Sequence, residues 1–305
     1  MKTGFIGLGK MGFNMVEHLL ELGHEVVAFD VSVEAVAAIA TIGATPASSL
    51  QHLVGELESP HVIWMMVPAG SPVDAVLGGL APFLKAGDIV IDGGNSRYTD
   101  TVVRARKLRE QGVRMLDVGT SGGLEGARHG ACMMVGGERE AYEQVEPLLR
   151  DLCVENGCGC MGASGSGHFV KMVHNGIEYG MMQAISEGFN LLRASGYEID
   201  NETVARVWSN GSVIRGWLME LAEKALARDS HLGYLGGKVA DSGEGRWTVE
   251  AAVDLGVPVP VIAGALFERF RSQSSESFSD KVVAALRHEF GGHAFEAPGT
   301  GEAKA

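Results

Sequence analysis

The chain of 305 residues has no long apolar run, no excess of basic residues and few cysteines. A helix that crosses a membrane needs about 18 or more consecutive apolar residues, and no stretch reaches that length. The formal net charge of −13 argues against a nucleic-acid partner, which requires a basic face. Nothing near Met1 resembles a signal peptide, so we expect a soluble, cytoplasmic protein without a membrane partner.

The four cysteines do not follow a metal-binding pattern. Cys153, Cys158 and Cys160 are close in sequence, but their spacing matches neither a CxxC pair nor a zinc motif with histidines. We therefore predict no metal site. Reduced thiols near the edge of a strand are the simpler interpretation for this compartment.

Short apolar runs alternate with helical patterns in the first half of the chain. The runs predicted to be strands are 3–6, 25–29, 62–67, 89–92 and 115–118. Between them, segments such as 11–22 and 101–111 place apolar residues at helical spacing. This alternation predicts an α/β domain with a Rossmann-type, doubly wound parallel sheet.

The pattern changes after the glycine- and serine-rich segment near residue 164. The helices predicted there are 169–195, 201–208, 213–227, 248–255, 261–271 and 280–290. We therefore predict a dinucleotide-binding domain at 1–164, an all-α substrate and dimerisation domain at 165–296, and a flexible tail at 297–305. Apolar helices such as 261–270 indicate a homodimer or homotetramer.

A G-x-G-x-x-G motif follows the first predicted strand and opens the first predicted helix. Its residues are Gly7, Leu8, Gly9, Lys10, Met11 and Gly12. In this position the first glycine permits a turn, the second lets the backbone approach a pyrophosphate, and the third packs the helix on its strand. Unpaired N–H groups at the helix N-terminus then face the phosphates. The motif predicts a dinucleotide cofactor.

Asp30 ends the second predicted strand. A carboxylate there accepts hydrogen bonds from a ribose 2′-hydroxyl and repels a 2′-phosphate, and no arginine follows it. We therefore expect NAD to be preferred, with NADP as the alternative. An aspartate at this place also suits a helix cap, which leaves a purely structural interpretation open.

Three further segments carry a resemblance to a known family. They are the run from Asp92 to Ser96, the run from Gly119 to Ala127, and the run from Gly165 to Gly180. Together they resemble the decarboxylating 6-phosphogluconate dehydrogenases, in particular the short branch of about 300 residues, which is often NAD-linked. The similarity runs from Lys2 to about Phe295. It implies oxidation of 6-phosphogluconate to ribulose 5-phosphate and carbon dioxide, in the pentose phosphate pathway or gluconate utilisation.

Four polar residues share one face of the long predicted helix: Lys171, His174, Asn175 and Glu178. Taken alone, they could form an exposed face with weak pairing. The resemblance implies instead that Lys171 is the base for hydride transfer and then stabilises the enolate. It also implies that Glu178 returns a proton to the carbon that loses its carboxylate.

The resemblance also implies the remaining contacts. The residues that it places on the sugar acid are Asn95, Ser121, Gly122, Gly123, His174 and Asn175, and those near the phosphate are Tyr179, Arg269, Arg287 and His293. Those at the nicotinamide end are Val67, Pro68, Ala69 and again Asn95. In the long enzymes the pair that matches Arg287 and His293 comes from the neighbouring subunit.

Two positions depart from the family pattern. Ser242 stands where the long enzymes usually carry lysine, and Glu244 where they carry threonine. The missing cation bears on the affinity for a phosphate. Two alternatives to the implied activity are also open. One is a β-hydroxyacid dehydrogenase that acts on a small unphosphorylated acid without decarboxylation. The other is a nucleotide-binding protein without catalysis.

Overall fold

The structure is a computed structural model that describes residues 1–274, 277–296 and 303–304. Its contacts divide the chain into two units, Met1–Gly176 and Ile177–Ala305. The division falls inside the long helix α8 (Ser166–Ala194). The predicted boundary near residue 164 lies just before this helix begins. The predicted tail lies almost entirely outside the described residues.

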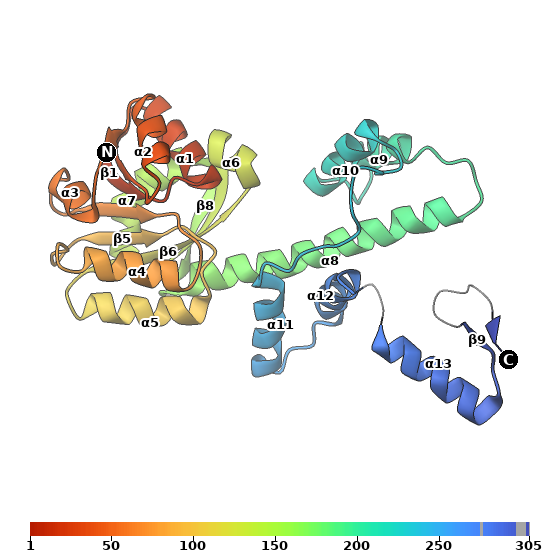
Figure 1. Cartoon of the computed structure of the whole chain (residues 1–305). Helices are drawn as coiled ribbons and strands as arrows, with labels where there is room; N and C mark the ends of the chain where they lie inside the picture. Colours follow the sequence, from red (N-terminus) through yellow and green to blue (C-terminus); the bar gives the residue numbers. More distant parts are fainter. Residues whose placement is uncertain (275–276, 297–302, 305) are drawn as a thin grey trace. The chain divides into compact units, whose positions relative to one another are not determined.

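The first unit is built on one eight-stranded sheet (Figure 1). In spatial order its strands are β3 (Thr45–Pro46), β2 (Glu25–Phe29), β1 (Lys2–Ile6), β4 (Val62–Met65), β5 (Ile89–Asp92), β6 (Arg114–Ser121), β7 (Ala131–Gly136) and β8 (Cys153–Gly162). The five predicted strands correspond to β1, β2, β4, β5 and β6. Order reverses between β1 and β4, as in a doubly wound nucleotide-binding sheet.

Helices cover both faces of this sheet. On one face α1 (Lys10–Glu21), α2 (Val33–Ala40), α6 (Gly123–His129) and α7 (Arg139–Asp151) supply residues to one buried apolar cluster. On the other face α3 (Leu50–Gly55), α4 (Ser71–Leu80) and α5 (Tyr98–Arg109) supply a second cluster. The central strands β1, β2, β4, β5 and β6 are mostly buried, which explains their continuous apolar runs. The predicted α/β class is confirmed.

The sheet is not wholly parallel, which corrects one part of the prediction. β6 and β7 pair antiparallel, with Asp117 opposite Gly136, whereas β7 and β8 are parallel. An antiparallel pair needs no long crossover, and the short helix α6 is sufficient to join the two strands. β3, β7 and β8 were not predicted; β8 carries the sequence ENGCGC, which lacks a clear apolar alternation.

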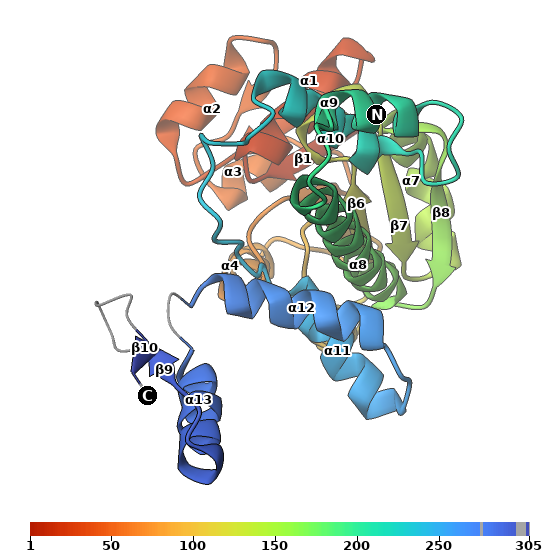
Figure 2. The ribbon, with the colours of Figure 1, turned by 90° about the vertical axis from the view of Figure 1, so that its right-hand side faces the viewer.

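The second unit is helical around the C-terminal part of α8. Its other helices are α9 (Asn201–Ser209), α10 (Trp217–Arg228), α11 (Glu244–Leu255), α12 (Pro260–Ser272) and α13 (Phe278–Gly291). Figure 2 views α8 nearly end-on, with α9 and α10 on one side and α11 and α12 on the other. Two small apolar clusters match this arrangement, one with α9 and α10 and one with α12. No helix of the described chain is long and apolar enough to cross a membrane.

One short pair of strands was not expected in an all-α unit. β9 (Phe295–Glu296) and β10 (Ala303–Lys304) pair antiparallel after α13. Each strand has two residues, so the unit remains helical in its described part apart from this pair.

Candidate functional site

The glycine motif forms a tight turn between β1 and α1. Gly7 has a φ of 99°, and a Cβ atom there would overlap the carbonyl oxygen of Met66. A Cβ atom on Gly12 would overlap the carbonyl oxygen of Gly7. Gly9 differs because nothing lies within 4 Å of its Cβ position, and it begins α1 without a side-chain cap. The turn therefore leaves open space at uncapped N–H groups, which fits the approach of a pyrophosphate.

Asp30 is tied to this turn by both carboxylate oxygens. Its Oδ2 accepts from the backbone N–H of Leu8 at 2.6 Å, and its Oδ1 accepts from the N–H of Ser32 at 2.8 Å. The cap of α2 is Ser32, whose hydroxyl accepts from the N–H of Ala35. The helix-cap interpretation of Asp30 is therefore wrong. The carboxylate instead links the glycine turn to the end of β2.

The loop after β5 presents Asn95 at the same edge of the sheet. Asp92 is fully buried and accepts from the N–H of Gly94 at 3.2 Å and from the hydroxyl of Ser96 at 2.7 Å. These bonds fold the loop so that Asn95 is exposed. A Cβ atom on Gly94 would lie 2.7 Å from the carbonyl oxygen of Val67, so this loop contacts the one that continues through Pro68 and Ala69. Both loops follow the carboxyl ends of parallel strands, where ligands bind in such sheets.

The start of α8 is fixed to the sheet by a buried carboxylate. Asp117 in β6 accepts from the N–H of Gly165 at 2.7 Å and from the N–H of His168 at 2.9 Å. Backbone atoms of Asp117 and Met134 lie so close to Gly167 that a side chain would not fit. Asp117 is not among the residues predicted from the sequence. The detectable signal was a charged residue inside an apolar strand, because a buried carboxylate requires hydrogen-bond donors.

Lys171 lies one turn further along α8, against β6. Lys171 is 6% exposed, and a Cβ atom on Gly119 would overlap the Cβ atom of Lys171. The helix can therefore approach the strand only because residue 119 is glycine. The lysine is held on a rigid strand–helix junction.

Three predicted site residues are connected by hydrogen bonds between β6 and the next turn of α8. The hydroxyl of Ser121 is 3.3 Å from Nε2 of His174, and Nδ1 of His174 is 3.1 Å from Oδ1 of Asn175. In a neutral ring, an Nδ1–H that donates to Asn175 leaves Nε2 to accept from Ser121. The structure thus brings β6 and α8 residues together within the first unit. Gly122 and Gly123 follow Ser121 at the start of α6, both with positive φ.

The second unit holds the predicted phosphate residues in two places. The guanidinium of Arg269 lies 3.4 Å from the ring centroid of Tyr179 and donates to the carbonyl oxygen of Ala240 at 2.8 Å. The hydroxyl of Tyr179 is 3.3 Å from that of Ser242, which donates to the carboxylate of Glu244 at 2.6 Å. Tyr179 and Arg269 are therefore neighbours. The buried carboxylate of Glu244 is connected to them through Ser242.

Arg287 and His293 lie at the C-terminal end of α13, and both are exposed. The N–H of His293 donates to the carbonyl oxygen of Arg287 at 3.5 Å. Within the described chain, neither side chain forms a hydrogen bond, ion pair or ring contact with Tyr179 or Arg269. Glu178, half-buried, follows Lys171 by seven residues on the continuous helix α8.

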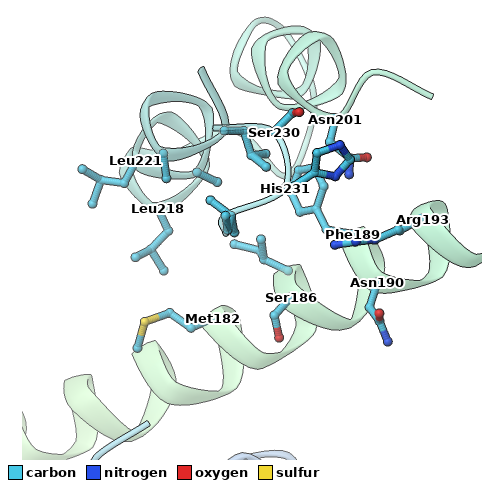
Figure 3. A pocket seen from close by; sticks show the side chains of 15 residues that line it. Met182, Ser186, Phe189, Asn190, Arg193, Asn201, Leu218, Leu221, Ser230 and His231 are labelled. Carbon is cyan, nitrogen blue, oxygen red and sulfur yellow. The ribbon is translucent and has the colours of Figure 1, made fainter. Parts of the chain in front are cut away.

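A cavity of about 490 Å³ lies elsewhere in the second unit (Figure 3). It is lined mainly by apolar side chains of α8 and α10, among them Met182, Phe189, Leu218 and Leu221, with Asn201 of α9 and His231 also in the lining. None of the predicted site residues lines it. In the described chain no group of three or more histidine, cysteine, aspartate or glutamate side chains could hold a metal ion.

Two family models together match nearly the whole chain. The NAD-binding domain of 6-phosphogluconate dehydrogenase matches residues 2–175, and the C-terminal domain of 6-phosphogluconate dehydrogenase matches residues 167–290. The first unit is therefore an NAD(P)-binding domain.

Proteins of the same length are among the similar sequences. YqeC of Bacillus subtilis, which carries a provisional 6-phosphogluconate dehydrogenase name, is 53% identical over 97% of this chain and 99% of its own. The NAD(+)-dependent, decarboxylating 6-phosphogluconate dehydrogenase of Haloferax volcanii is 49% identical over 96% of this chain and 98% of its own. The longer decarboxylating enzyme of Escherichia coli is 37% identical, and 64% of its length is covered.

Solved structures show the same architecture. The 6-phosphogluconate dehydrogenase of Plasmodium falciparum, studied with NADP+ and with 6-phosphogluconate, matches with a TM-score of 0.83 at 28% identity. The match covers 98% of this chain and 67% of that one. A 3-hydroxyisobutyrate dehydrogenase of Mycobacterium tuberculosis matches with a TM-score of 0.73 at 22% identity, over 94% of this chain and 99% of that one. The second likeness concerns the fold alone.

Proposed function

Because the chain belongs to the 6-phosphogluconate dehydrogenase family, we propose that it oxidises and decarboxylates 6-phosphogluconate to ribulose 5-phosphate and carbon dioxide, with NAD as the acceptor. The observation that carries this proposal is the position of Lys171. It is buried where α8 meets β6, beside the Ser121–His174–Asn175 chain.

The proposed chemistry uses two residues of α8. Lys171 takes the proton of the 3-hydroxyl, a role that requires its uncharged form, while NAD, when bound, accepts the hydride. The carbonyl that forms then accepts the electrons released as carbon dioxide leaves. The ammonium of Lys171 stabilises the resulting enolate oxygen. Glu178 returns a proton to the carbon that carried the carboxylate.

The proposed substrate contacts fall into two groups, one for the sugar acid and one for the phosphate. We assign the sugar acid to Asn95, Ser121 and the glycines that follow it, together with His174 and Asn175. Hydroxyl, amide and ring nitrogen groups suit a polyhydroxy acid because each can donate or accept.

We assign the phosphate to Tyr179, Arg269, Arg287 and His293. A guanidinium fork can bond two phosphate oxygens, and Arg269 is already fixed on the Tyr179 ring. Arg287→Ala should raise KM for 6-phosphogluconate sharply, with little effect on KM for NAD. An unchanged KM for the sugar acid would remove Arg287 from the site.

The preference for NAD rests on Asp30. Its carboxylate is held at the turn by the Leu8 N–H, and a second negative charge from a 2′-phosphate would be repelled there. The residues Gly7, Leu8, Gly9, Lys10, Met11 and Gly12 form the turn that would face the pyrophosphate.

We also propose that the chain works as a homodimer or homotetramer in the cytoplasm. α13 buries none of its residues, and Phe278 and Phe290 are 80% and 77% exposed. An amphipathic helix with no covered face loses the stabilisation that apolar burial provides. Light scattering on the purified protein tests assembly, and a monomer at every concentration would contradict it.

The activity test follows reduced cofactor and carbon dioxide together. The protein is incubated with 6-phosphogluconate and either NAD or NADP, and absorbance and released carbon dioxide are recorded. Equal yields of the two products, with NAD preferred, are expected. Reduced cofactor without carbon dioxide would indicate a β-hydroxyacid dehydrogenase, and no product with either cofactor would lead to gluconate and 3-hydroxyisobutyrate as the next substrates.

The Glu178→Gln variant tests the proton-donor role of Glu178 apart from the base role of Lys171. Loss of a proton donor typically lowers kcat by about a hundredfold or more, so this variant should turn over slowly. Glutamine keeps the size of the side chain and removes only the titratable group. Unchanged turnover in Glu178→Gln would refute the proton-donor role and leave the dehydrogenase proposal standing.

A further inference from the structure

Two of the cysteines occupy neighbouring positions on one face of β8. Cys153 is opposite Ala131 of β7, and Cys158 is opposite Met133. Ala131 and Met133 are two residues apart and both buried in the same apolar cluster. The register therefore shifts between the two pairs, and the residues between the cysteines bulge out. Asn156, in that bulge, has a φ of 61°.

This bulge brings the two thiols together although they are five residues apart in sequence. Successive positions on one face of a strand are roughly 6.6 Å apart, near the upper end of the Cα separations of about 4.4–6.8 Å found in disulfides. The side chains of Cys153 and Cys158 are already hydrogen-bonded to each other. Both are free and half-buried, so the pair can close with a small movement of the bulge.

The surroundings make the two thiols unequal. Cys158 is hydrogen-bonded by Cys153 and also by the hydroxyl of Tyr142. These contacts lower the pKa of Cys158, chiefly through the Cys153 thiol, although burial and Glu146 oppose the effect. The same contact raises the pKa of Cys153. The pKa of Tyr142 rises to about 12, mainly because burial disfavours its charged form.

The contact between the two thiols therefore favours the thiolate form of Cys158 over that of Cys153. Cys153 donates to the Cys158 sulfur, and the hydroxyl of Tyr142, which donates to Glu146 Oε1 at 3.4 Å, also acts on it, so the three groups titrate as one coupled set. Arg150 of α7 adds an attractive charge. A thiolate at moderate pH is the reactive form of cysteine.

We propose that Cys153 and Cys158 are an oxidation-sensitive pair that closes reversibly into an intramolecular disulfide when the protein meets a hydroperoxide. The thiolate of Cys158 attacks one peroxide oxygen, and the other oxygen leaves as water or alcohol. This forms a sulfenic acid on Cys158. The sulfur of Cys153 then attacks the Cys158 sulfur, and the sulfenic oxygen leaves as water.

The step is balanced because two thiols lose two electrons and two protons to the peroxide. A thiol reductant reverses it by exchange. Reversible disulfides of this kind are the form expected in a reducing compartment. None of the predicted substrate and cofactor residues lies on β8.

The test is mass spectrometry of the full-length protein after a short exposure to dilute hydrogen peroxide. We expect a Cys153–Cys158 cross-link in peptide maps, which a thiol reductant removes. In Cys153→Ser the intermediate cannot resolve, so Cys158 should be labelled by dimedone, a sulfenic acid reagent. In Cys158→Ser neither cross-link nor dimedone label should appear at residue 153.

Cys132 supplies an internal control because it is exposed, whereas Cys158 is half-buried. If exposure alone governed reaction, dimedone would label Cys132 first in Cys153→Ser, and that result would overturn the proposal. A cross-link from Cys158 to Cys160 in the wild type would also overturn it. Cys132→Ser and Cys160→Ser should both keep the Cys153–Cys158 cross-link.

Discussion

Placing a methyl group at Gly119 tests whether Lys171 must sit where α8 meets β6. The Cβ of Gly119→Ala would overlap the Lys171 Cβ and would lie 2.9 Å from its Cγ and 3.0 Å from the carbonyl oxygen of Gly167. None of these atoms is the free end of a flexible side chain. The first turns of α8 must therefore move away from the sheet.

Two effects of different size follow from that displacement. Overpacking of a buried site costs about 1–3 kcal/mol, which lowers Tm by roughly 2–4 °C for each kcal/mol in a chain of this size. A catalytic group misplaced by about 1 Å can lower the rate about a hundredfold. We therefore expect a folded protein with a modest fall in Tm and a much larger fall in kcat.

Steady-state kinetics with 6-phosphogluconate and NAD, beside a thermal melt, measure both effects. Gly78→Ala is the matched control, because Gly78 lies in α4 with open space at its Cβ position. Alanine in a helix interior should raise stability by about 0.5–1 kcal/mol and leave kcat unchanged. A Gly119→Ala enzyme with the wild-type kcat would refute the argument that this contact positions Lys171.

Three further changes test other contacts. Arg104 donates to Asp74 and holds the pKa of that carboxyl below its ordinary 3.8. In urea unfolding, wild type should therefore have a larger free energy of unfolding than Asp74→Asn, and this difference should be full above pH 3.8 and fall as the pH drops below it. An advantage that persisted in acid would contradict the pairing. Ser242→Lys should lower KM for 6-phosphogluconate roughly fivefold, since an exposed ion pair is worth up to about 1 kcal/mol; an equal or higher KM would count against a nearby phosphate. Asp30→Ser removes a charged acceptor worth about 1.5–3 kcal/mol, so kcat/KM for NAD should fall more than for NADP, and an unchanged ratio would exclude Asp30 as the selector.

The sequence predicted the nucleotide-binding half of the fold well because its signals are local. Strands buried on both faces appear as continuous apolar runs, and β2 and β5 begin and end at the predicted residues. β7 and β8 depend on neighbours instead. The segment Cys153–Gly162 carries three cysteines, three glycines and polar residues, and it becomes a strand because β7 supplies a partner.

The candidate site shows the same division between local and tertiary signals. Helical spacing alone placed Lys171, His174 and Asn175 on one face, and the structure adds Ser121 to that group through a bond across 53 positions in the chain. Spacing could not show that Ser32, and not Asp30, caps α2. The competing caps are two residues apart, and only the hydrogen bonds distinguish them.

The position of α8 depends on contacts that no local pattern contains. Asp117 accepts two N–H groups at the start of the helix, and a Cβ atom on Gly136 would lie 2.7 Å from both of its carboxylate oxygens. Gly167 on the helix has no room for a side chain against β6 and β7. The three residues act together. A side chain at either glycine would push the start of α8 away from the Asp117 carboxylate, and the hydrogen bonds to the helix N–H groups would be lost. Asp117, Gly136 and Gly167 thus fix the position of the helix that carries the predicted catalytic lysine, and the bond from the His168 N–H to Asp117 spans 51 positions of sequence. This explains why the spacing of residues along α8 could predict a shared face of the helix but not the position of the helix on the sheet.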